Sequence, residues 1–227
     1  MNNAPDLPQP VFHESLDERI GELRGVHVWT HDLDAAGDAW LDRDELLSSD
    51  ELSVAGRLRS PLARRRFVRS HVIARHLLAG VLQKPAGDIV FRRNRWGKPS
   101  VESPHDAALD FNFSHSDNAF LFSVCFGGTV GVDVETLCDN PDLLSIAESF
   151  FSPVEIASLR TAPPSEHRNL FFGYWTTKEA SAKLSGRGFS ADADSAEAAD
   201  RRQRFQTTLC VGRNEVAAAI VWRTGHE

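Results

Sequence analysis

Two acidic residues stand two positions apart in the segment TVGVDVE, residues 129–135. Side chains alternate along a β-strand, so the three valines would face one side, and Asp133 and Glu135 would face the other. Two carboxylates on one face can hold a hard divalent cation such as Mg²⁺, which prefers oxygen ligands. An edge strand exposed to solvent would also explain the pair, and the strand alone leaves both interpretations open.

A third carboxylate lies on a predicted helix further along the chain. Trp175, Glu179 and Lys183 are spaced four residues apart, so they share one face of a helix predicted over 166–186. A face rich in aromatic residues normally packs on a core. A surface Glu–Lys pair, worth only ~0.2–0.5 kcal/mol, would be the ordinary explanation. With the two acids of the strand, however, Glu179 could complete a magnesium site, and Lys183 could reach a phosphate oxygen.

Three further segments carry groups that can bind phosphate. FNFSHS (111–116) places Asn112 and Ser114 on one strand face and His115 on the other, although a single histidine beside aromatic residues is more often structural. ARRRFVR (63–69) carries four arginines, which either form a solvated basic face or anchor a phosphate. NRWGKP (94–99) is a glycine turn between cations, and by itself it is an ordinary hairpin.

Composition indicates a soluble globular protein. The 227 residues are 41% hydrophobic and 25% charged, with a net charge of −7 that argues against a nucleic-acid-binding surface. The apolar runs, such as VAAAIVW (216–222), are far shorter than the ~20 residues of a membrane span. The three cysteines form no CxxC pair, and no export signal is visible, so a cytoplasmic location is expected. A monomer is also expected.

The chain predicts mixed helices and strands without regular alternation, which favours an α+β fold. A faint repeat relates Ala74, Leu78 and Gly80 to residues 106 positions later, which hints at two related halves. The predicted strands are 25–33, two within 88–103 around Gly97, two within 108–126 around a turn at 116–118, 129–135, 206–212 and 215–222. The predicted helices are 42–58 with a break or cap at Ser48 or Ser49, 60–82, two within 141–160 split at Ser152–Pro153, and 166–186, and residues 191–205 are predicted to form a loop.

The motifs resemble the paired signature of the 4′-phosphopantetheinyl transferase family. GVDVE (131–135) is followed by WTTKEA (175–180) and then by Lys183. WGKP (96–99) and FNFSHS (111–116) stand where that family has its upstream motifs. Any one of these motifs is weak, but four in this order are specific.

The length and the WTTKEA form resemble the Sfp-type branch of the family, a single chain of two pseudo-symmetric halves. The similarity covers roughly residues 60–190. It implies an α+β fold in which each half, 1–127 and 128–227, is a small antiparallel sheet packed on a long helix. The segment after Gly188 is longer and more acidic than the family pattern, which puts the connection to the last strands in doubt.

The resemblance also implies a site at the junction of the halves. Asp133, Glu135 and Glu179 would ligate Mg²⁺, and Asp133, Glu179 and Lys183 would be catalytic, with Glu179 taking the proton of an attacking serine. Arg66 would bind the 3′-phosphate of coenzyme A, and the turn 93–99 would pass over its adenine. The full set assigned to coenzyme A is Arg66, Arg93, Trp96, Gly97, Lys98, Pro99, Asn112, Ser114, His115, Lys178 and Lys183.

The implied reaction transfers 4′-phosphopantetheine from coenzyme A to a serine of an acyl or peptidyl carrier protein and releases 3′,5′-ADP. The carrier would touch packed helices near residues 140–170. Two alternatives remain at this stage. One is a non-catalytic module that binds coenzyme A or the carrier, and the other is an unrelated magnesium phosphohydrolase, although no GxxxxGK[ST] phosphate loop is present.

Overall fold

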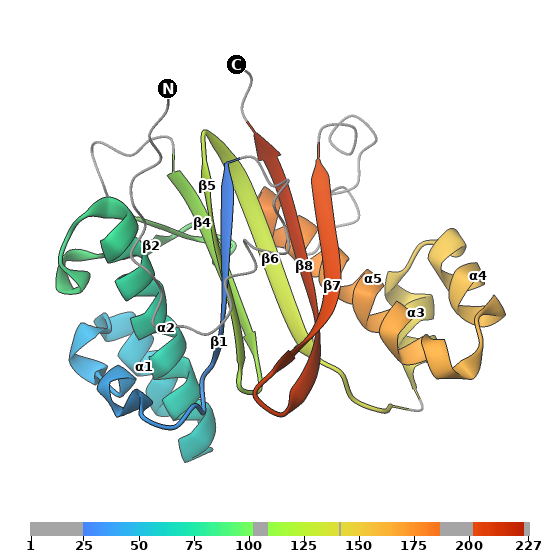
Figure 1. Cartoon of the computed structure of the whole chain (residues 1–227), viewed down its shortest axis with the longest axis horizontal. Helices are drawn as coiled ribbons and strands as arrows, with labels where there is room; N and C mark the ends of the chain where they lie inside the picture. Colours follow the sequence, from blue (N-terminus) through green and yellow to red (C-terminus); the bar gives the residue numbers. More distant parts are fainter. Residues whose placement is uncertain (1–24, 102–108, 141, 187–201, 225–227) are drawn as a thin grey trace.

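The computed structural model describes residues 25–101, 109–140, 142–186 and 202–224. Two three-stranded antiparallel sheets stand side by side in the middle of the molecule, with orders β1-β5-β4 and β6-β8-β7, and a separate hairpin pairs β2 with β3 (Figure 1). The strands are β1 Val26–Asp32, β2 Phe91–Arg93, β3 Pro99–Val101, β4 Leu109–Ser116, β5 Ala119–Phe126, β6 Gly128–Thr136, β7 Gln203–Val211 and β8 Asn214–Thr224. The helices are α1 Ser49–Arg57, α2 Pro61–Leu82, α3 Leu143–Phe150, α4 Pro153–Thr161 and α5 Pro164–Ser185, with short 3-10 turns at Asp38–Leu41, Asp44–Leu46 and Ala86–Asp88.

The two sheets and the two long helices form four layers. Alternate residues of β5 separate two cores: Phe120 and Phe122 pack beneath α2, whereas Leu121 and Cys125 pack against the second sheet. Alternate residues of β8 likewise pack either against the first sheet or against α5. Both strands are therefore buried on two faces, which explains why they read as continuous apolar runs.

The paired sheets and helices confirm the α+β fold with pseudo-symmetric halves. The helices α2 and α5 have equal lengths of 22 residues, and each covers the outer face of one sheet. Only one residue, Gly127, separates β5 from β6. The division into residues 1–127 and 128–227 remains an interpretation. The repeat behind it is imperfect, because Gly80 lies inside α2 whereas Gly186 caps α5 in the left-handed conformation, with φ of 61°.

Most predicted elements are present, and two predictions require correction. The helix predicted over 42–58 begins only at Ser49, because the Ser48 side chain and Glu51 form a capping box there, and 3-10 turns precede it. The loop predicted over 191–205 is wrong for Gln203 to Phe205, which begin β7 and pair with β8. Residues 191–201 of that prediction, and the family departure after Gly188, lie outside the described residues.

The first sheet joins the second through the side chains of β4. Carboxylate and amide oxygens of Asp110 and Asn112 accept hydrogen bonds from the backbone N–H groups of Val130 and Val132 on β6, at 2.8 and 3.0 Å. The Ser116 hydroxyl oxygen accepts a bond from the N–H group of Thr136 in the same register. Polar side chains thus do for β6 what a neighbouring backbone does within a sheet, and they hold the edge of one sheet against the other.

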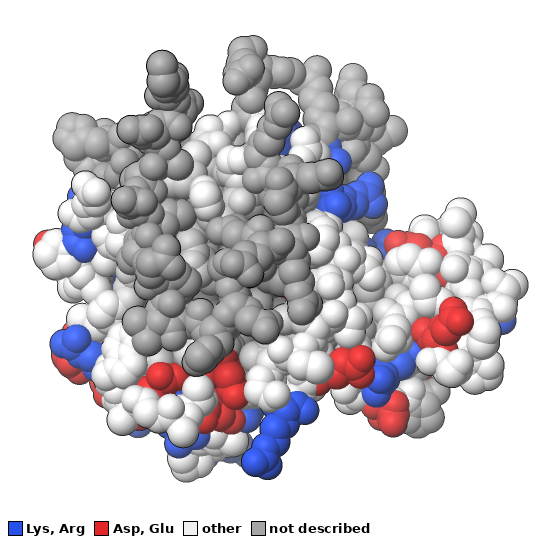
Figure 2. Space-filling view, in the orientation of Figure 1, with Lys and Arg blue, Asp and Glu red and all other residues white. Residues whose placement is uncertain are grey.

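No helix in the described part of the chain is long and apolar enough to cross a membrane. Cys125, Cys138 and Cys210 are all free thiols. On the face drawn in Figure 2, acidic and basic side chains of described residues are mixed along the lower edge and form no continuous basic stripe. That the chain binds no nucleic acid stays a prediction.

Gly131 fixes how closely α5 approaches β6. A Cβ atom at this position would collide with the backbone of Ala180 and Leu184, which cannot give way as a flexible side chain can. We therefore expect Gly131→Ala to lower the free energy of unfolding by about 1–3 kcal/mol or more, because overpacking forces the helix away from the sheet. Urea denaturation monitored by circular dichroism measures this change.

Gly56→Ala is the matched control, because nothing lies within 4 Å of a Cβ atom at Gly56 on α1. Alanine is the better helix former, so this variant should be as stable as the parent or slightly more stable. Equal urea midpoints for the two variants would contradict the close approach of α5.

Candidate active site

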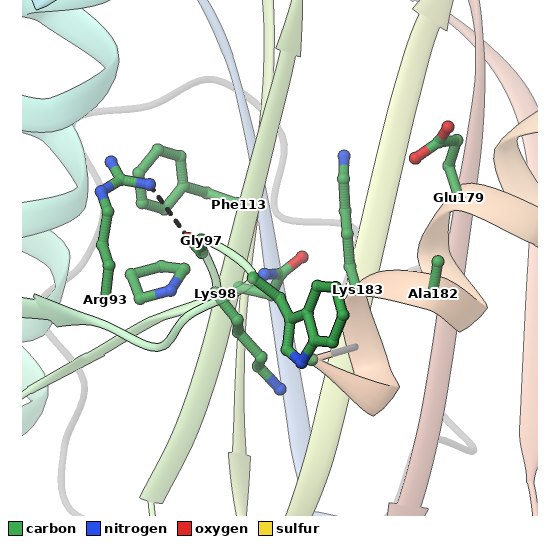
Figure 3. Close-up of a pocket in the computed structure, with 11 residues that line it drawn as sticks. Arg93, Gly97, Lys98, Phe113, Glu179, Ala182 and Lys183 are labelled. Atoms are coloured by element: carbon green, nitrogen blue, oxygen red, sulfur yellow. Dashed lines mark hydrogen bonds between the residues drawn. The ribbon is translucent and has the colours of Figure 1, made fainter. Parts of the chain in front are cut away.

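A cavity of about 310 Å³ opens where the β2–β3 hairpin, β4 and α5 meet (Figure 3). Eight residues that the family resemblance assigned to the site line it, and Phe113, Ala182 and Gly186 complete the lining. The eight are Arg93, Trp96, Gly97, Lys98, Pro99, Asn112, Glu179 and Lys183. Residues from before and after position 128 therefore line one cavity, and their assignment to a coenzyme A site stays a prediction.

A buried acid and a lysine lie beside this cavity. Asp133 is 2% exposed, and its Oδ1 accepts hydrogen bonds from Lys183 Nζ at 2.5 Å and from Ser114 Oγ at 2.9 Å. Its Oδ2 is buried and has no hydrogen-bond partner among the described residues. The Lys183 ammonium supplies the positive charge that the buried carboxylate needs, but it leaves one oxygen unsatisfied.

The other two acids flank Asp133. Glu135 on β6 accepts a hydrogen bond from Ser116 Oγ at 2.8 Å, whereas Glu179 on α5 makes no hydrogen bond with the described residues. Burial raises the pKa of Asp133, Glu135 and Glu179, and the Asp133 charge raises the pKa of the other two further. Three carboxylates that disfavour one another's ionised form are the electrostatic environment that a divalent cation relieves.

The donor set fits a hard cation, although the side chains as placed do not gather around one point. Among the residues that the structure describes, no three His, Cys, Asp or Glu side chains are close enough to hold a metal ion. Asp133 and Glu135 are instead engaged by Lys183, Ser114 and Ser116. The unsatisfied Oδ2 of Asp133 and the mutual repulsion of the acids still favour a cation at this place.

The hairpin of the cavity rim is anchored to the end of α5. Lys98 Nζ donates to Asp110 Oδ2 at 2.6 Å and to the carbonyl oxygens of Val130 and Leu184 at 3.1 and 3.4 Å. The Asn94 side chain donates to the carbonyl oxygen of Gly186 at 2.9 Å. The Lys98 ammonium is thus committed to protein acceptors.

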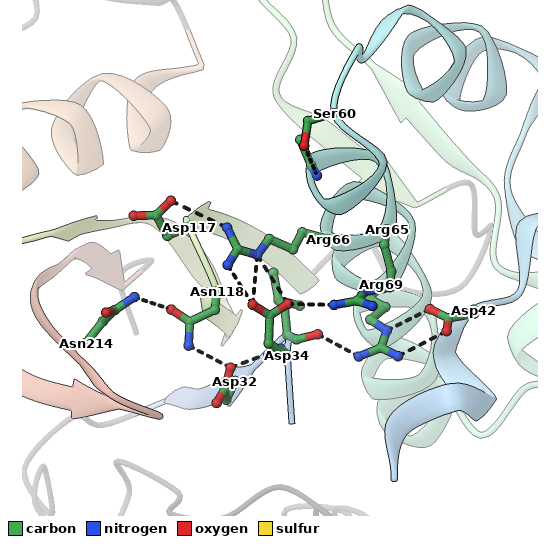
Figure 4. A network of polar contacts seen from close by, with 12 residues as sticks. Asp32, Asp34, Asp42, Ser60, Arg65, Arg66, Arg69, Asp117, Asn118 and Asn214 are labelled. Atoms are coloured by element: carbon green, nitrogen blue, oxygen red, sulfur yellow. Dashed lines mark hydrogen bonds and ion pairs between the residues drawn. The ribbon is translucent and has the colours of Figure 1, made fainter. Parts of the chain in front are cut away.

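Arg66 lies in a separate polar network at the first turns of α2 (Figure 4). Its guanidinium donates to both oxygens of Asp34, with a shortest distance of 2.6 Å, and to Asp117 at 3.4 Å. His115, on the outer face of β4, is accessible to solvent. Partial desolvation by the surrounding protein nevertheless lowers the pKa of its imidazole, and the nearby charges of Lys183 and Arg66 lower it further. The positive charges of both Lys183 and Arg66 therefore act on His115. The role of Arg66 stays a prediction.

Lys178 points away from the cluster that contains Glu179 and Lys183. Its Nζ forms an ion pair with Glu155 of α4 at 3.0 Å and lies 5.8 Å from the centre of the Phe151 ring. Trp175 stacks on Phe171 in the core beside α3 and α4. The assignment of Lys178 to coenzyme A stays a prediction that its present contacts do not support.

Sequence reasoning missed three contributors to the site. Asp110 shares its carboxylate between Lys98 and the β6 backbone, and Phe113 lines the cavity. His71, buried in α2, contacts the rim through Arg93 at 3.1 Å. Only the alternation of β4, which puts Asp110 on the face of Asn112 and Ser114, was a signal for the first of them.

Acids, a lysine and a basic rim around one cavity are suited to an enzyme that handles phosphate esters. The family model of the 4′-phosphopantetheinyl transferase superfamily matches residues 129–225. The 4′-phosphopantetheinyl transferase HetI of Nostoc sp. (strain PCC 7120) is 39% identical over 185 residues, which are 81% of this chain and 76% of that protein. Psf-1 of Bacillus pumilus is 33% identical over 63% of this chain and 60% of its own length. Sfp of Bacillus subtilis (strain 168) is 31% identical over 57% and 56%.

The chain therefore belongs to the 4′-phosphopantetheinyl transferase superfamily, and the likeness to Sfp supports the Sfp-type branch. It is a phosphopantetheinyl transferase enzyme, which excludes an unrelated phosphohydrolase.

The raised pKa of Glu179 has a consequence for stability. A carboxyl whose pKa is raised by folding binds its proton more tightly in the folded protein, so its ionised form opposes folding at neutral pH. Glu179→Gln should therefore raise the melting temperature at pH 7 without divalent cations, by about 1–3 °C. The gain should fade as the pH falls toward the ordinary glutamate value of 4.5, because the parent carboxyl is then protonated.

Thermal unfolding between pH 4 and pH 8 checks this expectation, and added Mg²⁺ should raise the melting temperature of the parent more than that of the variant. Glu166→Gln is the control, and it should not raise the melting temperature. Glu166 is exposed in the first turn of α5, where its negative charge interacts favourably with the helix dipole. A destabilised Glu179→Gln protein at pH 7 would contradict the electrostatic account of the cluster.

Proposed function

We propose that the protein transfers 4′-phosphopantetheine from coenzyme A to a serine hydroxyl of an acyl or peptidyl carrier protein, with Mg²⁺, and releases 3′,5′-ADP. The observation that carries the proposal is the Asp133 cluster. A buried carboxylate with one unsatisfied oxygen, two neighbouring acids and the Lys183 ammonium adjoin a cavity with Arg93 on its rim. Membership of the transferase superfamily supports the same reaction class.

The reaction replaces a phosphoanhydride bond of coenzyme A by a phosphoester bond to serine. The serine oxygen forms a bond to the β-phosphorus of coenzyme A, and the bond from that phosphorus to the bridging oxygen of the diphosphate breaks. 3′,5′-ADP leaves with the bridging oxygen. Phosphoryl transfer depends on positioning and on neutralising the charge of the phosphate oxygens rather than on a covalent intermediate with the protein.

Two residues of α5 have different roles toward the reacting atoms. Lys183 has an ammonium beside the cavity, and it stabilises the negative charge that develops on the phosphate oxygens. Glu179 lies one helical turn earlier in the cavity wall, has a raised pKa and no hydrogen bond among the described residues, so its carboxylate is available to accept the serine proton.

Asp133, Glu135 and Glu179 would hold the Mg²⁺, which when bound supplies charge neutralisation at the diphosphate. Ser114 and Ser116 orient two of these ligands by donating hydrogen bonds to Asp133 and Glu135. The hydroxyls thereby tie both metal-binding acids of β6 to β4, which also contributes Asn112 to the cavity.

The carrier protein would contact α3 and α4, which pack against α5 at one end of the molecule (Figure 1). These two helices expose Leu144, Phe150 and Val154, with 36, 47 and 78% of their surfaces accessible. Exposed apolar side chains on neighbouring helices suit contact with a protein partner. We also propose that the protein acts as a monomer in the cytoplasm, because one chain supplies both sides of the cavity and its cysteines are free thiols.

The test is a single incubation of the protein with coenzyme A, Mg²⁺ and an apo carrier protein, followed by intact mass measurement of the carrier. We expect the carrier to gain one phosphopantetheinyl group and 3′,5′-ADP to appear in equal amount. Asp133→Asn should lower the turnover rate by at least about 10²-fold, because it weakens the cation site and leaves phosphate charge uncompensated. Circular dichroism shows whether the variant is folded.

No mass gain with acyl and peptidyl carriers, while coenzyme A still binds, would indicate a module that binds coenzyme A without turnover. A folded Asp133→Asn protein with the parent rate would overturn the metal assignment. Omission of Mg²⁺ with a chelator should abolish turnover, and readdition should restore it.

Arg66 allows a sharper test of where the 3′-phosphate binds. Arg66→Ala should raise KM for coenzyme A by about tenfold and leave KM for 3′-dephospho-coenzyme A nearly unchanged, because a charge-assisted hydrogen bond to a phosphate would be lost. Steady-state kinetics with both substrates measure the two values.

Arg64→Ala is the comparison, because Arg64 pairs with Asp44 at the surface, one residue before the Arg65–Arg66 pair that contacts Asp34. An equal rise of KM for both substrates in Arg66→Ala would show that Arg66 acts through its ion pair with Asp34 instead. The same selective effect in Arg64→Ala would move the assignment to Arg64.

A further inference from the structure

His71 is a buried polar residue that contacts the cavity rim. It lies on α2 with 3% of its surface exposed, between the rings of Phe67 and Phe113, whose centres are 4.1 and 5.3 Å away. Its Nε2 lies 3.1 Å from Nη2 of Arg93, and Nη1 of Arg93 donates to the carbonyl oxygen of Gly97 at 3.1 Å. The exposed guanidinium of Arg93 is therefore held at two points on the cavity rim.

The neighbours of His71 allow one protonation state. Its Nδ1 lies 2.9 Å from the carbonyl oxygen of Phe67, which can only accept, so Nδ1 carries the proton. Its Nε2 faces a guanidinium, which can only donate, so Nε2 is bare and accepts from Arg93. The imidazole is thus neutral, and the carbonyl of the preceding helical turn selects the tautomer that Arg93 requires.

Burial and the two nearby arginines favour this neutral state, and one nearby acid opposes it. Glu51 Oε1 of α1 lies 3.9 Å from Nε2 and has no hydrogen-bond partner among the described residues, whereas the other oxygen, Oε2, pairs with Arg75 at 2.6 Å. Burial lowers the pKa of His71 to about 4, the Glu51 charge opposes that shift, and Arg93 and Arg75 add to it. The ring therefore remains an acceptor across the physiological range.

We infer that His71 is a positioning residue that holds the Arg93 guanidinium to bind a phosphate group of coenzyme A. The inference rests on the proposed function for the identity of the ligand. Arg93 has more N–H donors than its bonds to His71 and Gly97 use, and it lies across the cavity from Lys183 and Glu179 (Figure 3). Its side chain, and not only the backbone of the turn 93–99, then contributes to the site.

A fixed guanidinium binds an anion more tightly than a free one, because less side-chain entropy is lost on binding. His71 supplies that order from the core of the first half without touching the ligand. Arg75, one turn further along α2, stacks on Phe91 at 4.2 Å and holds the strand β2 that carries Arg93. Replacing His71 should therefore weaken binding through Arg93 alone.

The experiment measures the dissociation constants of coenzyme A and 3′-dephospho-coenzyme A by calorimetry, with Mg²⁺ present, for parent and variants. His71→Phe keeps a ring between Phe67 and Phe113 but removes the acceptor, and His71→Gln keeps an acceptor oxygen. Arg93→Leu removes the guanidinium, and the double variant combines His71→Phe with Arg93→Leu. The controls are His76→Phe, on α2 against Trp40, and Arg57→Leu, an exposed arginine of α1.

We expect Arg93→Leu and His71→Phe each to weaken coenzyme A binding by about tenfold. The double variant should be no weaker than Arg93→Leu, His71→Gln should recover most of the loss, and both controls should match the parent. In turnover assays the loss should appear in KM rather than kcat. A loss confined to coenzyme A assigns Arg93 to the 3′-phosphate, and a loss with both ligands assigns it to the diphosphate.

Parent-like binding by a folded Arg93→Leu protein would overturn the phosphate contact. Losses that add in the double variant would overturn the positioning role of His71, because independent effects add and shared ones do not. If His71→Phe does not fold, His71→Met takes its place in the comparison, because a thioether fills the buried space but is only a weak acceptor. A parent that binds no coenzyme A would instead refute the proposed function.

Discussion

The structure depends on one interface, where side chains of β4 hydrogen-bond to the backbone of β6. Asp110, Asn112 and Ser116 accept from N–H groups twenty residues further along the chain, so the two strands keep one fixed register. Because side chains alternate, this register also places Ser114 against Asp133 and Ser116 against Glu135. The contact that joins the halves is therefore the contact that orients the acids.

Burial of these acids opposes folding. Asp133 is almost inaccessible, the pKa of each of the three acids is raised, and one oxygen has no partner among the described residues. A domain built for stability alone would place apolar groups there. The tight contact of α5 with Gly131 and the apolar layers on both sides of the sheets hold the charges in place.

The hairpin that borders the cavity is short, and buried polar contacts hold it. Lys98 and Asn94 tie it to β4, β6 and the end of α5, whereas His71 and Arg75 tie its first strand to α2. The two long helices thus act on the same three-residue strands from opposite sides. This hairpin, β4 and α5 together line the cavity.

Local patterns in the sequence determined the long helices, the paired strands and the residue types of the acidic cluster. Periodicity, Ser48 and Ser60 as caps, and glycine at Gly186 act within a few residues, so they could be read without the fold. The tertiary structure alone decided which polar side chains meet. Lys98 turned out to be committed to Asp110 and two carbonyls, Lys178 to Glu155, and Arg66 to Asp34. It also placed His71 against Arg93 of the rim. These pairings join residues up to 86 positions apart, and only the packing of the halves brings their atoms together.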